Sequence, residues 1–133
     1  MGLTGASAYT SMSATTGVEN ADPHRLIQML IDGAIEKINR AKFFLKNNKV
    51  AEKGQHISWA ISIIGGLRGS LDHEKGGEIA SNLDALYDYC TVTLVAANIE
   101  NDENKLNDVL KIMQQVKEAW DGIREQALEE LNK

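Results

Sequence analysis

The stretch DPHRLIQMLIDGAIEKINRAKFFLK, residues 22–46, predicts the first helix of this chain. Asp22 suits the N-cap position because its carboxylate can accept hydrogen bonds from the free N–H groups of the first turn. Pro23 suits the next position, where a backbone N–H is not needed. Apolar side chains then recur at helical spacing and predict a core-facing stripe, formed by Leu26, Met29, Leu30, Gly33, Ala34, Ala41 and Phe44.

Three further segments have the same helical periodicity. We expect helices over about 50–71 and 78–98, and a last one that opens at residues 101–103 and ends between Arg124 and Lys133, with a frayed tail from Glu125. Residues 72–77 predict a connection whose two glycines make the turn. These apolar side chains form the expected core stripes: Ile57, Ala60, Ile61, Ile64, Leu67 and Leu71; Ile79, Leu83, Leu86, Tyr87, Cys90, Leu94 and Ala97; Leu106, Val109, Leu110, Met113, Val116, Trp120 and Ile123. Four amphipathic segments with short connections predict an all-α, antiparallel up-and-down four-helix bundle.

A pair of glycines, Gly65-Gly66, falls in the middle of the second expected helix. Glycine is unfavourable in a helix interior, so the pair needs an explanation. We favour a local kink or close packing between helices over a flat spot that another backbone could approach.

Second apolar patches extend three of the helices beyond one buried face. They consist of Ile31, Ile35 and Ile38 in the first helix, Trp59 and Ile63 in the second, and Tyr89, Val92, Val95 and Ile99 in the third. Either these side chains fill the shoulders of the bundle, or they form a groove that receives apolar helices of a partner. We take them as candidate partner-binding residues.

The first twenty residues differ from the rest of the chain. They are rich in Gly, Ala, Ser and Thr, and Glu19 is their only charged residue. Such a segment cannot build a core alone, so it is either a frayed tail or a flexible arm that docks a few apolar side chains, Tyr9 among them. We expect two parts: an arm over 1–20 and a bundle domain over 21–133.

Composition excludes several functional classes. A chain of 133 residues fits one domain, and its net charge of −5 argues against nucleic-acid binding. A single cysteine cannot form an internal disulfide, which fits a reducing cytosol. The sequence contains neither a secretory signal nor an apolar stretch of the roughly 20 residues needed to span a bilayer, so we expect no stable membrane insertion.

Signals of catalysis or metal binding are poor. His24, His56 and His73 are too far apart in sequence to share one helical turn, and none has a glutamate three positions before it, as a di-iron bundle requires. Cys90 lies on an apolar stripe, which favours a buried structural thiol. We therefore predict no enzyme activity, cofactor or metal. A metalloprotein bundle and a self-associating bundle remain the alternatives.

The sequence resembles the FliS family of bacterial flagellar secretion chaperones. The resemblance covers nearly the whole chain and rests on Ala8-Tyr9, residues 22–34, residues 71–80, Asn82-Leu83, residues 86–89, Ala97-Asn98, Asp102 and Trp120. It differs from the family at Thr91-Val92-Thr93, where basic residues are often found.

The resemblance implies a cytoplasmic export chaperone without enzymatic activity. It implies binding to the disordered C-terminal segment of flagellin, protection against premature polymerisation, and delivery to the flagellar type III export apparatus. It also implies that the arm covers part of the groove, and that the arm tyrosine, matched here by Tyr9, helps to transfer cargo to an export gate component. Regulators or co-chaperones are possible further partners.

Overall fold

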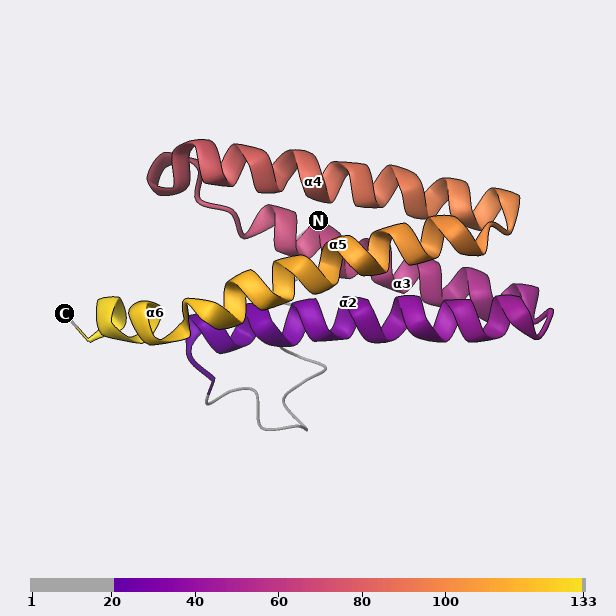
Figure 1. Ribbon diagram of the computed structural model, residues 1–133, viewed down its shortest axis with the longest axis horizontal. Helices are drawn as coiled ribbons and strands as arrows, with labels where there is room; N and C mark the ends of the chain where they lie inside the picture. Colours follow the sequence, from indigo (N-terminus) through magenta and orange to yellow (C-terminus); the bar gives the residue numbers. More distant parts are fainter. Residues whose placement is uncertain (1–20, 133) are drawn as a thin grey trace, which may run out of the picture.

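In the part of the chain that the structure describes, four long helices form an antiparallel bundle and a short helix follows them. The computed structural model describes residues 21–132; the expected arm, with Tyr9, lies outside this range. The helices are α2 (Pro23–Lys46), α3 (Val50–Gly69), α4 (His73–Glu100), α5 (Glu103–Gly122) and α6 (Arg124–Leu131) (Figure 1). The predicted all-α, up-and-down four-helix architecture is confirmed.

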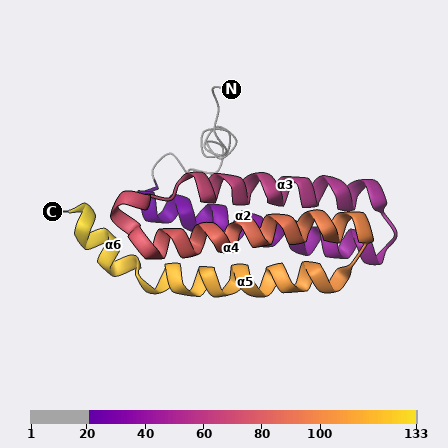
Figure 2. The same ribbon diagram turned by 90° about the horizontal axis from the view of Figure 1, so that it is seen from above.

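The four long helices stand at the corners of a square. α2 packs against α3 and α5, and α4 packs against the same two helices. Seen from above, α3 and α5 lie on either side of α2 and α4, and α6 continues beyond one end of the bundle (Figure 2). Figure 1 shows that α4 and α5 run close together at the turn that joins them and diverge toward the other end.

Aspartate residues start three of the helices. The Asp22, Asp72 and Asp102 carboxylates accept hydrogen bonds from backbone N–H groups of the first turns of α2, α4 and α5, at 2.8–2.9 Å. The predicted cap at Asp22, with Pro23 behind it, is confirmed. Asn101, in the left-handed conformation at φ 53°, ends α4.

The expected connection over 72–77 is only partly a turn. α4 begins at His73, and its first turn is separated from the rest by Gly77, which has φ 50° and ψ −123°. A side chain is unfavourable at these angles, so glycine permits the break. The regular part of α4 thus starts at Glu78, as expected, and the sequence analysis missed the short helical turn before the break, which the Asp72 cap supports.

Two other expectations concern helix continuity. α3 runs without a kink through Gly65-Gly66; Gly66 is buried, which agrees with close packing between helices, and Gly65 is exposed. The tail from Glu125, expected to fray, is helical in α6, which follows a break at Ile123.

The core lies along the centre of the four helices. Its buried apolar members are Leu30, Ile31, Ala34, Ile38, Ala41, Ile57, Ala60, Ile63, Ile64, Leu67, Tyr87, Cys90, Leu94, Ala97, Leu106, Val109, Leu110 and Met113. Within residues 21–132, no buried side-chain nitrogen or oxygen lacks a hydrogen-bond partner. The predicted stripes supply most of this core; an exception is Ile79, which is 72% exposed.

Candidate functional site

An apolar groove opens where α4 diverges from α5. Its volume is about 790 Å³, and it is lined mainly by apolar side chains of α2, α4 and α5 together with the end of α3. Its apolar lining includes Ile27, Ile31, Leu67, Leu71, Ile79, Leu83, Leu86, Tyr87, Val116, Trp120 and Ile123. A groove of this size and lining suits apolar side chains of a partner.

Trp120 forms part of the groove lining and also fastens the end of α5 to the start of α2. Its ring stacks on that of His24 with centroids 4.5 Å apart, and its Nε1–H donates to the His24 carbonyl oxygen at 2.9 Å. His24 Nε2 lies 2.6 Å from the Trp120 carbonyl oxygen, so this nitrogen carries the proton and donates it. These reciprocal bonds hold the Trp120 side chain in one position.

An ion pair closes the same junction. Arg124 donates to both carboxylate oxygens of Asp22, at 2.8 and 3.2 Å, and its Nη1 also lies 3.2 Å from His24 Nδ1. The hydrogen bond from Arg124 lowers the pKa of Asp22 to about 2, with a further contribution from the backbone N–H of Arg25. We call Asp22, His24, Trp120 and Arg124 the clasp.

A second apolar surface lies on the solvent-facing side of α4. Tyr89, Val92, Val95 and Ile99 are between 44% and 76% exposed. We call these four residues the α4 outer stripe. All four were predicted from the sequence as partner-binding residues, and the structure brings them together on one helix face.

The other predicted residues do not join this surface. Ile31, Ile38 and Ile63 are at most 6% exposed and belong to the core, although Ile31 also reaches the groove lining. The sequence analysis placed them on second faces. However, α2 packs against α3 and α5, and α3 packs against α2 and α4, so a wider arc of each helix is buried.

Two predicted residues lie at the margin of the core. Ile35 is partly buried against it. Trp59 is 38% exposed, and the Lys37 ammonium lies 3.7 Å from the centroid of its ring. Ile35 and Trp59 lie on α2 and α3, so neither of them belongs to the α4 outer stripe.

Most of the groove lining was missed as a functional surface. The sequence analysis assigned Ile79, Leu83 and Leu86 to the core stripe of their helix, whereas the divergence of α4 from α5 leaves them around a groove. The only local sequence signal near it is Gly76-Gly77, where α4 breaks next to the groove wall.

Features expected of a metal or thiol enzyme are missing from residues 21–132. No group of three or more His, Cys, Asp or Glu side chains is placed to hold a metal ion there. Burial raises the pKa of the Cys90 thiol to about 11, which disfavours the reactive thiolate. None of the helices in this part of the chain has the length and apolar character needed to cross a membrane.

Comparison of the sequence with known proteins assigns the chain to a family. The model of the flagellar protein FliS family matches residues 5–127. The flagellar secretion chaperone FliSB of Pseudomonas aeruginosa is 46% identical over 115 residues, covering 86% of this chain and 91% of the relative. The flagellar secretion chaperone FliS of Salmonella typhimurium is 44% identical over 124 residues, covering 92% of each chain. That of Bacillus subtilis is 30% identical over 112 residues, covering 84% and 82%.

The match extends over the α2 start, the groove and the α4 outer stripe, all of which lie within residues 5–127. The resemblance noted in the sequence is therefore confirmed, and the chain belongs to the FliS family of flagellar secretion chaperones.

Proposed function

We propose that this chain is a cytoplasmic chaperone that binds the disordered C-terminal segment of flagellin, prevents its premature polymerisation and delivers it to the flagellar type III export apparatus. The observation that carries the proposal is the apolar surface of α4, which the other helices of the bundle leave exposed. The family to which the chain belongs supplies the kind of partner to expect. The proposed activity is binding and release, without catalysis.

The α4 outer stripe is suited to an amphipathic helix. Its residues follow one another at three- and four-residue spacings, so they present a ridge against which apolar side chains of a second helix can pack. Each of the four side chains would bury about half of its surface, which is worth about 1 kcal/mol per residue. The stripe alone would thus contribute about 4 kcal/mol before the cost of ordering the client.

The groove offers a second place for the same client. Its lining is mainly apolar, and the clasp fixes one of its walls before a partner arrives. A wall that is already ordered loses little conformational entropy on binding, so more of the apolar burial appears as affinity.

We assign residues 1–20 to an arm that shields the groove when no client is bound. The arm joins the bundle at residue 21, next to Asp22 of the clasp, and therefore starts beside a groove wall. Within this proposal, Tyr9 helps to transfer the client to an export gate component. Regulators or co-chaperones could share the exposed surfaces.

The proposed mechanism is coupled folding and binding. The flagellin segment becomes helical on the chaperone, which covers the apolar faces that would otherwise associate into filaments. Because the client loses conformational entropy as it becomes ordered, its affinity per unit of buried area is moderate, and it can still dissociate from the chaperone.

A charge placed on the α4 outer stripe tests this proposal. We expect Val92→Asp to weaken binding of the host flagellin about tenfold or more by isothermal titration calorimetry, since a carboxylate would have to be desolvated against apolar side chains. Phe43→Asp is the matched control, because Phe43 is equally exposed, at 61%, but lies on α2. Ile31→Asp is unsuitable because it would bury an unpaired charge in the core.

The same variants distinguish the alternatives. Unchanged affinity of a folded Val92→Asp protein, with circular dichroism like that of the wild type, would contradict a role of the stripe in client binding. Light scattering on the isolated chain addresses self-association: a dimer that Val92→Asp converts to a monomer would make the stripe an interface between copies. Co-purification with flagellin that lacks its C-terminal segment then identifies the bound part.

A further inference from the structure

One polar side chain lies at the floor of the apolar groove. Tyr87 of α4 lines the groove, yet it is only 3% exposed, so it lies deep in the groove rather than at its rim. Its ring is part of the buried core. The hydroxyl at the tip of this ring is the part that needs a hydrogen-bond partner.

The Tyr87 hydroxyl has no such partner within residues 21–132. The Thr91 hydroxyl donates to the backbone carbonyl oxygen of Tyr87 at 3.0 Å, and no other side-chain hydrogen bond involves Tyr87 there. No fully buried side-chain oxygen in this part of the chain lacks a partner, so the Tyr87 oxygen keeps contact with solvent. Because the residue is otherwise enclosed, this contact lies in the groove that it lines.

Burial also keeps this hydroxyl protonated. Removal from water disfavours the phenolate and raises the pKa of Tyr87 to about 12, with a smaller contribution from Cys90. At neutral pH the group is therefore an O–H that can both donate and accept a hydrogen bond.

The other polar groups of the lining are engaged or lie at the rim. The Ser70 hydroxyl and the Trp120 Nε1–H donate to backbone carbonyl oxygens of the bundle, at 2.7 and 2.9 Å. Asp72, Lys75 and Gln115 are exposed, and water can hydrate them at the edge of the groove. Among the lining residues that the structure describes, Tyr87 thus supplies the hydrogen-bonding group at the floor.

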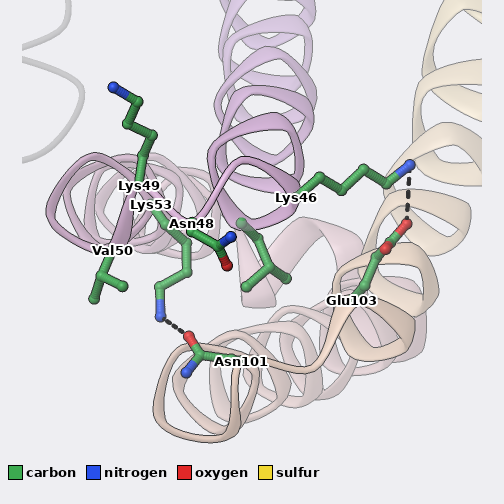
Figure 3. A pocket seen from close by; sticks show the side chains of 8 residues that line it. Lys46, Asn48, Lys49, Val50, Lys53, Asn101 and Glu103 are labelled. Carbon is green, nitrogen blue, oxygen red and sulfur yellow. Dashed lines mark hydrogen bonds and ion pairs between the residues drawn. The ribbon is translucent and has the colours of Figure 1, made fainter.

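The small cavity at the other end of the bundle provides a contrast. It has a volume of about 320 Å³ and lies between the α2–α3 and α4–α5 turns (Figure 3). The buried Lys53 ammonium donates to the Asn98 carbonyl oxygen and to the Asn101 side-chain oxygen, and Lys46 pairs with Glu103 at the rim. The buried polar group of this cavity is thus already engaged within the bundle, whereas that of the groove is not.

A client that fills the groove removes water from the Tyr87 hydroxyl. A buried hydroxyl that is left without a partner opposes binding, so a well-matched client replaces the lost water. The backbone groups inside a helix are bonded to one another, so the replacement comes from a side chain. The floor is apolar around Tyr87 and offers no opposite charge, which favours a neutral side chain over a charged one.

We infer that the Tyr87 hydroxyl bonds to one amide or hydroxyl side chain on the otherwise apolar face of the client helix, and so fixes the register of that helix in the groove. The inference rests on the proposed function and adds to it this chemical requirement. A client helix displaced along the groove would leave both polar groups unpaired, just as one buried polar residue fixes the register of a coiled coil.

Tyr87→Phe tests the inference, because it removes the hydroxyl and keeps the ring. We expect the full-length variant to bind a peptide of the C-terminal segment of the host flagellin about fivefold more weakly by isothermal titration calorimetry. Its urea unfolding should match that of the wild type, since the hydroxyl has no partner within the bundle. Ser58→Ala is the control: it also removes a hydroxyl, but Ser58 is exposed on α3 and lines neither cavity.

A second set of peptides identifies the partner of the hydroxyl. Each Asn, Gln, Ser or Thr of the flagellin segment is replaced in turn by an apolar side chain of similar size. We expect one of these replacements to weaken binding to the wild-type chain about fivefold and to have little effect on binding to Tyr87→Phe. Such a difference shows that the two groups interact with each other.

The remaining outcomes are distinguishable. Equal or tighter binding of the peptide by a folded Tyr87→Phe chain would refute the inference and leave the proposed function intact, as would peptide replacements that act equally on both chains. A marked loss of stability in Tyr87→Phe would refute it as well, because the hydroxyl would then have a partner inside the protein. If the wild-type chain does not bind the peptide, the proposed function falls together with the inference.

Discussion

Replacement of Gly77 by alanine tests whether the break in α4 requires glycine. Gly77 has φ 50° and ψ −123°, and an added Cβ would meet no heavy atom within 4 Å. The substitution therefore changes backbone strain without a steric clash from the surroundings. Holding a residue other than glycine at such angles costs about 1–3 kcal/mol, so we expect Gly77→Ala to lower the free energy of unfolding by that amount.

Gly65→Ala is the same chemical change, but we expect it to raise the free energy of unfolding. Gly65 lies inside the regular helix α3, is exposed, and has nothing within 4 Å of an added Cβ. Alanine is favoured over glycine in a helix interior by about 0.5–1 kcal/mol, so this variant should be stabilised by that amount. The two variants should thus differ by about 1.5–4 kcal/mol.

Urea denaturation followed by circular dichroism measures both variants. For an m value of about 1.5 kcal/mol/M, the difference separates their midpoints by about 1 to 2.7 M. Equal midpoints, or a Gly77→Ala protein as stable as the wild type, would refute the reasoning, because the break would then not depend on the conformational freedom of glycine.

Two further predictions concern the clasp and the core. Arg124→Gln should reduce the free energy of unfolding near neutral pH, and this difference from the wild type should vanish in acid. The pKa of Asp22 is lowered from 3.8 to about 2 in the folded protein. Its ionised carboxylate therefore stabilises the fold at pH values above 3.8, and this contribution is lost as the pH falls through about 2. A difference that persists at pH 2 would contradict the ion pair as its cause. Leu94→Ala, at a fully buried site, should cost about 2–5 kcal/mol in chemical denaturation, whereas Val95→Ala, on the exposed stripe beside it, should cost less than about 1 kcal/mol; similar costs would show that the two faces of α4 are assigned wrongly.

Periodicity and capping residues were sufficient to predict the four long helices, though not α6. Asp22-Pro23 identified the start of α2, and the stripes identified most of the core, since these signals act between residues a few positions apart. Even the break near Gly77 was visible as a glycine pair, although its form, one helical turn before the break, was not. Local sequence thus determines where the helices begin and which face is mainly buried.

Contacts between distant segments could not be predicted in this way. The clasp joins His24 to Trp120, 96 positions away, and nothing in either local pattern indicates that they meet. The burial of Ile38 depends on α2 having two neighbours, and the groove depends on the angle between α4 and α5. A helical wheel treats each helix alone, so it identifies apolar arcs without showing which of them a neighbouring helix covers.

α4 contributes residues to both apolar surfaces, the groove and the outer stripe, and this affects how a client dissociates. Residues near its start border the groove, while the outer stripe follows nearer its end and faces solvent. If flagellin is the client, one straight helix cannot occupy both places, and two helical pieces joined by a bend are needed. The second piece then binds at high effective concentration, yet a competitor can displace the pieces one after the other. Tight retention and stepwise unloading would thus follow from the same geometry.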